Sequence, residues 1–357
     1  MTHRDELIAT VKHLTQAGKG FLAADESPNT LKQKFDKINV EQKEENRRAY
    51  RELLFTTPDL EKHISGVILF SETVSQSTHD SKNFAQLLQS RGIVPGIKLD
   101  EGLAELYPGS EEKYTLGLDT LDKRAAQFYQ LGCRFAKWRC VLKILNGTSP
   151  SELSIREVAY NLARYASLCQ KNGLVPIVEP ELLTDGSHSI ELCATVSRRI
   201  FSAVFAALNE YQVILEGCLL KPHMITAGAT WEGKKDLNAI AKHTVAALRD
   251  TLPVNLGGVF FLSGGQGELE ATLCLHLINK ENNTKGKSWP ISFSFGRALQ
   301  NSVVKAWGGK AENTKRAQEL LLARAKMNFD ATLGHYDSAH ELKDFADESM
   351  YVKNYSY

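Results

Sequence analysis

Short apolar runs recur along this chain at intervals of roughly thirty to forty-five residues, and there are eight of them. Each has the length of a strand, most are nearly continuous in apolar residues, and helix-like segments separate them. Parallel strands need crossover helices, so eight such units predict a (β/α)8 TIM barrel, with a doubly wound open sheet as the alternative. The runs are GFLAAD, SGVILF, VPGIKL, FAKWRCVL, LVPIVEP, LEGCLLKP, GGVFFLSG and WPISFSFG.

The segment between the fourth and fifth runs has the features of a crossover helix. Ser154 and Glu157 form a predicted capping box, and Asn172-Gly173 is a stop signal before the next run. Apolar residues follow the predicted cap at helical spacing, namely Ile155, Val158, Leu162, Tyr165 and Cys169. This stretch therefore predicts a strand–helix–strand unit.

Composition excludes several classes of protein. The formal net charge is +1 with no polybasic block, which argues against nucleic-acid binding, and no stretch is long and apolar enough for membrane insertion. The six cysteines stand singly in apolar segments and the amino terminus lacks an apolar signal region, so we expect reduced thiols and a cytoplasmic location. The ten histidines show no zinc-binding spacing, and we expect no metal and no cofactor.

Polar residues gather at the carboxyl ends of the runs, where a barrel places its active site. Each has a plainer interpretation: Asp25 and Ser27 as helix caps, Glu179 as a loop ion-pair partner, the basic residues as rim side chains with solvated heads, and Ser-Gly-Gly as a turn. Their joint occurrence at one end favours a site. The residues are Asp25, Glu26, Ser27, Lys98, Asp100, Lys137, Arg139, Glu179, Glu181, Lys221, Ser263, Gly264, Gly265, Gly296 and Arg297.

Glycines after the seventh and eighth runs predict a phosphate site. Backbone N–H groups at Gly264 and Gly296 approach an anion closely, a helix start adds its positive end, and Arg297 supplies a bidentate clamp. Lys98, with Ser27 across the mouth, predicts a second anion site. Together they suit a substrate that is charged at both ends.

Lys221 ends an apolar run and is followed by Pro222. An ammonium at such a position loses solvation, and a second cation at Lys137 disfavours it further, so both effects favour the neutral amine. A neutral amine forms an imine with a carbonyl, and the protonated imine draws electrons from the neighbouring bond. Glu179 is then placed to shuttle protons, and Asp25 to remove a hydroxyl proton that starts carbon–carbon cleavage.

These residues lie in segments that resemble the class I fructose-1,6-bisphosphate aldolases of the eukaryotic glycolytic type. The resemblance covers essentially the whole chain and its motifs are highly specific in combination. The segments are GKGFLAADES, PGIKLDEG, FAKWRCVLKI, LARYASLCQKNGLVPIVEPE, LEGCLLKP, FLSGGQ, FSFGRALQ and KAWGG.

The resemblance implies a metal-independent lyase of glycolysis and gluconeogenesis that cleaves fructose 1,6-bisphosphate reversibly to dihydroxyacetone phosphate and glyceraldehyde 3-phosphate. It implies a Schiff base on Lys221, acid/base work by Glu179, handling of the C4 hydroxyl by Asp25 and Lys137, positioning of charges by Glu181, and proton exchange by the final Tyr357. It further implies a homotetramer, and relatives suggest actin or adhesin-tail binding. The positions implied to bind substrate are Ser27, Lys34, Arg47, Lys98, Arg139, Ser263, Gly264, Gly265, Ser294, Gly296 and Arg297.

The chain departs from the family pattern at four of these or neighbouring positions. His223 stands where Asn or Ser is usual, Lys34 where Arg is common, Thr30 where Ser is frequent, and Glu101 where Lys is frequent. None removes a chemical group from the mechanism. They bear on affinity and on the preference for the bisphosphate over fructose 1-phosphate, because Lys does not replace a bidentate Arg.

Two segments follow from this organisation. We expect residues 1–340 to form one barrel domain with terminal helices, the last of which begins near Asn313. Residues 341–357 lie outside the eight-strand pattern and are expected to form a flexible carboxyl-terminal tail.

Overall fold

Eight parallel strands close into a barrel in the computed structural model, which describes residues 3–145, 150–286, 288–341 and 348–355. The predicted TIM barrel is confirmed. The open-sheet alternative is wrong, because β1 pairs with both β2 and β10 and leaves the sheet no free edge. The strands, in their order around the barrel, are β1 (Gly20–Ala24), β10 (Ile291–Phe295), β9 (Gly258–Phe261), β8 (Leu219–Leu220), β7 (Val175–Leu182), β6 (Phe135–Leu142), β3 (Val94–Lys98) and β2 (Ile64–Leu69).

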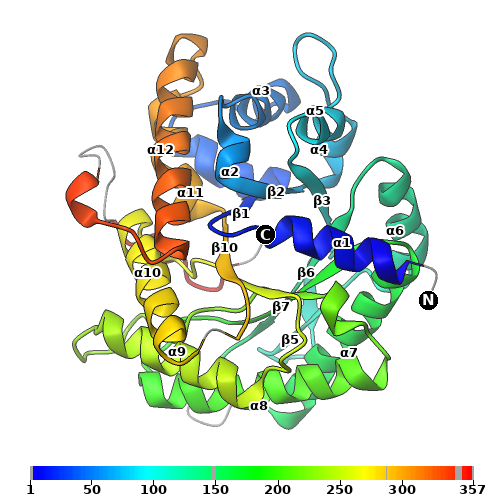
Figure 1. Ribbon diagram of the computed structural model, residues 1–357, viewed down its shortest axis with the longest axis vertical. Helices are drawn as coiled ribbons and strands as arrows, with labels where there is room; N and C mark the ends of the chain where they lie inside the picture. Colours follow the sequence, from blue (N-terminus) through cyan, green and yellow to red (C-terminus); the bar gives the residue numbers. More distant parts are fainter. Residues whose placement is uncertain (1–2, 146–149, 287, 342–347, 356–357) are drawn as a thin grey trace.

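Helices surround the barrel and cover its outer face (Figure 1). Their apolar sides pack on the outward-facing strand residues, which forms the larger of two hydrophobic clusters. The α-helices are α1 (Arg4–Leu14), α2 (Pro28–Asp36), α3 (Glu44–Phe55), α4 (Ser71–Ser75), α5 (Phe84–Ser90), α6 (Leu121–Gln130), α7 (Glu152–Lys171), α8 (Ile190–Glu210), α9 (Leu237–Thr251), α10 (Glu268–Thr284), α11 (Arg297–Trp307) and α12 (Thr314–Thr332). Short 3-10 turns are η1 (Leu60–Lys62), η2 (Leu215–Gly217), η3 (Ala311–Asn313) and η4 (Ser338–His340).

Helix α1 lies across the centre of the barrel in Figure 1 and contributes to the second hydrophobic cluster, inside the barrel. Its buried residues Leu7, Val11 and Leu14 share one face because they are four and three positions apart. Within the barrel Phe21 stacks on Phe260 with ring centroids 4.0 Å apart. The interior is therefore packed at this level, and the central cavity lies toward the carboxyl ends of the strands.

Two local predictions are wrong. The sixth run is a strand only at Leu219–Leu220, because residues 215–217 form a 3-10 turn and Pro222 has no N–H to continue the ladder. Helix α7 begins at Glu152 rather than after Ser154. Ser151 is its N-cap and accepts a hydrogen bond from the Ser154 N–H, while Glu112 binds the Ser151 hydroxyl at 2.6 Å. This contact from another element selects the earlier cap.

A small hairpin follows β3 and was not predicted. Strands β4 (Leu103–Glu105) and β5 (Lys113–Thr115) pair antiparallel, and each is three residues long. The Thr115 hydroxyl donates to the Arg139 carbonyl at 2.8 Å, and Asn161 on α7 donates to the Thr115 carbonyl. The hairpin therefore supports the outer side of β6.

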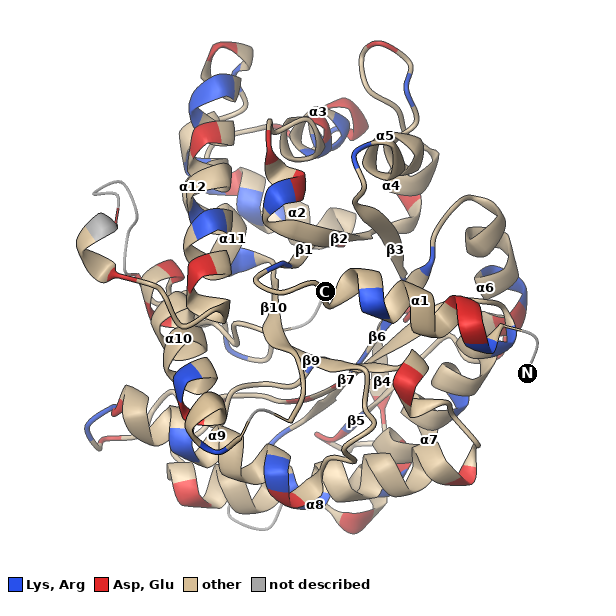
Figure 2. Cartoon of the chain, in the orientation of Figure 1, with Lys and Arg blue, Asp and Glu red and all other residues tan. Residues whose placement is uncertain are grey.

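The surface carries both signs of charge. Figure 2 shows basic and acidic residues interspersed along the outer helices, in keeping with a net charge of +1. None of the helices in the described part of the chain combines the length and the apolar composition needed to span a bilayer. The division into a domain of residues 1–340 and a tail of residues 341–357 stays a prediction.

Candidate active site

Lys221 lies at the carboxyl end of β8, where its backbone N–H still donates to the Val178 carbonyl of β7 at 2.8 Å. The side chain is 3% exposed, and its Nζ lies 3.2 Å from Oε1 of Glu179. The neighbouring strand thus places a carboxylate beside a buried lysine. This is the arrangement that proton transfer to and from the lysine nitrogen requires.

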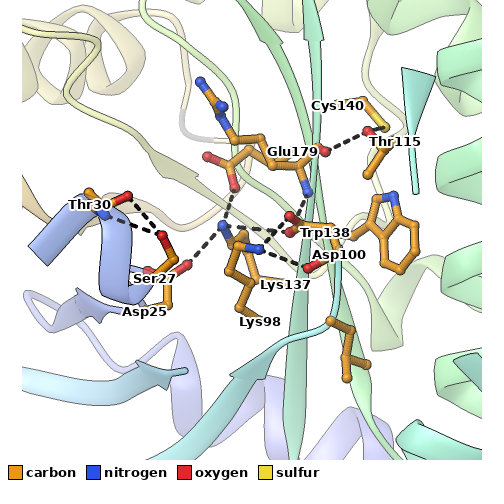
Figure 3. Close-up of polar contacts among 12 residues, drawn as sticks. Asp25, Ser27, Thr30, Lys98, Asp100, Thr115, Lys137, Trp138, Cys140 and Glu179 are labelled. Atoms are coloured by element: carbon orange, nitrogen blue, oxygen red, sulfur yellow. Dashed lines mark hydrogen bonds and ion pairs between the residues drawn. The ribbon is translucent and has the colours of Figure 1, made fainter. Parts of the chain in front are cut away.

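Lys137 on β6 is the centre of the charged cluster shown in Figure 3. The side chain is fully buried, and its Nζ lies 2.8 Å from Asp25, 3.4 Å from Glu179 and 3.9 Å from Asp100. Glu179 therefore stands between Lys137 and Lys221. Buried charges are stable only when they are paired in this way.

Strand alternation explains why these side chains face inward. Lys137 and Arg139 point into the barrel, whereas Trp138 and Cys140 point outward, where the Trp138 indole donates to Asn161 on α7 at 2.7 Å. Lys98, which is the register partner of Lys137 on β3, is 7% exposed. The alternative that the basic residues are rim side chains with solvated heads is wrong.

Asp25 follows β1 directly and is 4% exposed. Burial alone would raise the pKa of its carboxyl, but the Lys137 and Lys221 cations outweigh burial and lower the pKa from 3.8 to about 2. Asp25 does not cap a helix. It is ionised at neutral pH and lies within reach of a ligand in the cavity.

Glu181 and Arg139 form a second buried pair beside this cluster. Burial raises the pKa of Glu181, and the adjacent Arg139 guanidinium outweighs it, so the net shift is downward. The neighbouring Glu26 also has a lowered pKa, since Lys34 and Arg51 outweigh its burial. The mouth of the barrel thus holds carboxylates that remain charged.

An anion cradle faces Lys221 across the cavity. It comprises Ser263, Gly264, Ser294, Gly296 and Arg297, all of which line the cavity together with Asp25, Glu179, Glu181 and Lys221. The Ser294 hydroxyl is buried without a hydrogen-bond partner, Gly264 has a φ of +57°, and Gly296 caps the amino terminus of α11. A helix start, a free hydroxyl and a guanidinium in one place suit a phosphate group.

The second predicted anion site is only partly assembled. Ser27 does cap a helix, since its hydroxyl accepts from the Thr30 N–H of α2, and the ammonium of Lys98 pairs with Asp100 at 2.7 Å. Lys34 pairs with Glu26, which places it near the mouth. None of Ser27, Lys34 and Lys98 lines the central cavity, so their phosphate contacts stay a prediction.

Arg47 lies on α3 and is outside the set that lines this cavity. Its guanidinium binds Glu72, and it also donates to the Gln42 side chain at 3.0 Å. The role in substrate binding that the resemblance implies for Arg47 stays a prediction.

The described end of the chain packs over the anion cradle. Tyr355 lines the cavity, with the Arg297 guanidinium 4.0 Å from its ring centroid, and Arg297 also donates to the Met350 carbonyl at 2.8 Å. Gly265 accepts from the Met350 N–H, and a Cβ at Gly265 would lie 2.9 Å from the Tyr351 Cα. Close packing of the tail therefore requires glycine there, where φ is +85°.

With the tail in this position the cavity holds about 50 Å³, which is room for a few water molecules. The bisphosphorylated sugar that the resemblance implies would therefore require Tyr355 to leave this cavity. The role that the resemblance implies for the tail falls on Tyr357, which lies outside the described residues. Tyr355 lies just ahead of the chain end, and its position depends on contacts far apart in sequence.

No group of three or more His, Cys, Asp or Glu side chains in the described ranges is arranged to hold a metal ion. The six cysteines are buried as free thiols.

Comparisons with known proteins agree on one family. A model of the family described as "Fructose-bisphosphate aldolase class-I" matches residues 6–357. Fructose-bisphosphate aldolase 4, cytosolic, of Arabidopsis thaliana is 54% identical over 353 residues, which cover 99% of this chain and 89% of that protein. The cytoplasmic isozyme of Cicer arietinum is 53% identical over 357 residues, covering 99% of this chain and 98% of the relative.

A solved structure gives the same result at the level of the fold. Fructose-bisphosphate aldolase from Plasmodium falciparum, crystallised in complex with TRAP and a small-molecule inhibitor, superposes with a TM-score of 0.92 at 50% identity. The match covers 94% of this chain and 96% of that one.

Proposed function

The chain belongs to the class-I fructose-bisphosphate aldolases, and on that premise we propose that it cleaves fructose 1,6-bisphosphate reversibly through an imine on Lys221. The products are dihydroxyacetone phosphate and glyceraldehyde 3-phosphate. One observation carries the proposal: a buried lysine at the end of β8 lies 3.2 Å from a carboxylate that also contacts Lys137. That lysine shares its cavity with a phosphate-type cradle.

The first step joins the Lys221 nitrogen to the C2 carbonyl carbon of the sugar, and the carbonyl oxygen leaves as water. Glu179 supplies and removes the protons that this dehydration requires, because its Oε1 lies beside the Lys221 nitrogen. Leu219 and Leu220 precede the lysine and are fully buried, which keeps bulk solvent away from its stem.

Cleavage follows when Asp25 takes the proton of the C4 hydroxyl. The electrons of the O–H bond form the aldehyde carbonyl, the C3–C4 bond breaks, and its electron pair passes into the iminium to give an enamine. Lys137, 2.8 Å from Asp25, stabilises the oxygen at C4 as its charge changes. Protonation of the enamine at C3 and hydrolysis of the imine release dihydroxyacetone phosphate and restore Lys221.

The cradle of Ser263, Gly264, Ser294, Gly296 and Arg297 is assigned to the phosphate on C1. The cradle and Lys221 line the same small cavity, so a phosphate held in the cradle fixes the distance between C2 and the Lys221 nitrogen. Binding energy from this non-reacting group thereby positions the carbonyl for attack.

The setting of the enzyme follows from its relatives. Their names place them in the cytosol or cytoplasm, and we assign this chain the same location and a role in glycolysis and gluconeogenesis. A homotetramer, and a scaffold role in binding actin or an adhesin tail, are proposed by analogy; the Plasmodium relative was crystallised with TRAP. Sedimentation of the purified protein alone tests the homotetramer, and sedimentation with F-actin tests actin binding.

A cleavage assay with the purified chain tests the activity. We expect turnover of fructose 1,6-bisphosphate that is unchanged by EDTA, because the iminium itself accepts the electrons. Lys221→Met is expected to lower kcat by at least about a thousandfold. The matched control is Lys234→Met, since Lys234 is exposed and lies outside the central cavity. EDTA-sensitive turnover, or an active Lys221→Met variant, would contradict the mechanism.

A further inference from the structure

Asp100 lies between two lysines that belong to different parts of the site (Figure 3). Its Oδ1 is 2.7 Å from the Nζ of Lys98, which also donates to the Asp100 carbonyl at 2.8 Å. Its Oδ2 is 3.9 Å from the Nζ of Lys137 and accepts a hydrogen bond from the Arg139 N–H at 3.3 Å. One carboxylate thus connects the second anion site with the cleavage pair.

This carboxylate is part of a chain of alternating charges. Three cations and three carboxylates follow one another within 4 Å, and none of the six side chains is more than 8% exposed. With each group ionised their charges cancel, and a buried charge that loses its partner is costly, so a change at one end of the chain alters the pairing at the other. The six are Lys98, Asp100, Lys137, Asp25, Glu179 and Lys221.

A phosphate that arrives at Lys98 competes with Asp100 for the ammonium. The Lys98 head already has two acceptors from Asp100, namely a carboxylate oxygen and a carbonyl oxygen. A phosphate dianion bound to the third N–H of this ammonium shares its positive charge, and the Asp100 carboxylate then lacks part of its compensating charge. Lys137 is within reach to supply it, at 3.9 Å.

The inference rests on the proposed function and extends it to substrate preference. We propose that Asp100 is a positioning residue that couples phosphate occupancy at Lys98 to the Asp25–Lys137 pair, so that the second phosphate raises kcat as well as affinity. When the phosphate holds Lys98, Lys137 shifts toward Asp100 and loosens its 2.8 Å contact with Asp25. Asp25 then becomes a stronger base toward the C4 hydroxyl.

The resting state of Asp25 fits this account. Burial raises the pKa of Asp25, but nearby lysines, including Lys137 and Lys98, lower it to about 2, so the carboxylate is a weak base while all of them hold it. A phosphate at Lys98 cancels one of these cations directly. Movement of Lys137 toward Asp100 weakens the effect of the Lys137 cation on the pKa of Asp25.

Asp100→Asn tests the coupling, because the amide keeps the shape of the side chain and its oxygen still accepts from the Arg139 N–H. We expect kcat for fructose 1,6-bisphosphate to fall about tenfold and kcat for fructose 1-phosphate, which lacks the second phosphate, to change less than about twofold. Asp250→Asn is the matched control. Its carboxylate is exposed, pairs with Arg198 and lies outside the central cavity, so both values of kcat should stay unchanged.

Lys98→Met provides a second test that does not depend on the folding of Asp100→Asn. It should lower the ratio of the two kcat values in the same way, and adding Asp100→Asn to it should lower the ratio no further. Equal losses of kcat with both sugars, or a change confined to KM, would overturn the coupling. Borohydride trapping of dihydroxyacetone phosphate on wild-type Lys221 is the separate readout: its absence refutes the proposed function, whereas its presence leaves the kcat ratio to decide on Asp100.

Discussion

His223, two residues after Lys221, is a neutral imidazole whose hydrogen bonds connect β7 to α8, and we call this connection the brace. The Leu182 N–H at the end of β7 donates to its Nδ1 at 3.2 Å, so Nε2 carries the proton and donates to the Ser197 hydroxyl at 2.8 Å. That hydroxyl donates in turn to the Cys193 carbonyl on α8. Each group is satisfied, and the brace fastens the segment after the proposed imine lysine to the strand that carries Glu179.

Protonation would break this brace, and the structure sets the size of the effect. Burial lowers the pKa of His223 from 6.5 to about 4, although the Glu181 carboxylate opposes the shift and His188 adds to it. The unfolded chain therefore binds more protons than the folded chain between pH 6.5 and pH 4. Stability is fully present above pH 6.5, and about 2 kcal/mol of unfolding free energy is lost between pH 7 and pH 5.

The measurement compares wild type with His223→Asn, which removes the titrating group and leaves His188 and Glu181 in place. Guanidinium unfolding at pH 7, 6 and 5, at one fixed protein concentration, gives the difference in unfolding free energy at each pH. As the pH falls from 7 to 5, we expect wild type to lose about 2 kcal/mol of unfolding free energy relative to the variant. Parallel pH dependences for the two proteins would refute the buried neutral imidazole.

Three further outcomes are expected at the cradle and the tail. Arg297→Ala should raise KM for the bisphosphate about 10- to 100-fold, because it removes a charge-assisted clamp, whereas exposed Arg249→Ala should not; an unchanged KM counts against the cradle. Tyr355→Ala should tighten binding of dihydroxyacetone phosphate about threefold, because the Tyr355 ring stacks on Arg297 and must leave before the ligand binds. Calorimetry measures this affinity, and weaker binding by the variant would argue that the tail assists the ligand. Deletion of Tyr357 should slow tritium exchange into dihydroxyacetone phosphate while single-turnover cleavage persists, and equal changes in both would remove its proposed role.

The barrel was predictable from the sequence because strands buried on both faces are continuous apolar runs, and the carboxyl ends of such strands meet at one mouth. The barrel prediction therefore places Asp25, Glu179 and Lys221 together at this mouth. Local rules failed where contacts from elsewhere decide the outcome. Glu112 selects Ser151 as the cap of α7, and the backbone of residues 215–217 turns although its composition suits a strand.

The pairing of charges was the least predictable part of the site. Asp100 stood at a strand end, but its distances to Lys98 and Lys137 depend on how β3 and β6 align. Tyr355 reaches Arg297 through contacts that span more than fifty residues and follow no periodic pattern. Such arrangements arise from tertiary structure, and no single segment encodes them.

Borohydride reduction in the presence of dihydroxyacetone phosphate, followed by peptide mapping, tests the central claim most directly. The imine mechanism predicts one stable adduct per chain, on the peptide that contains Lys221, and no adduct in Lys221→Met. Exposed Lys234→Met should label like wild type. An adduct on another lysine such as Lys137, or no adduct at all in an enzyme that cleaves the bisphosphate, would contradict it.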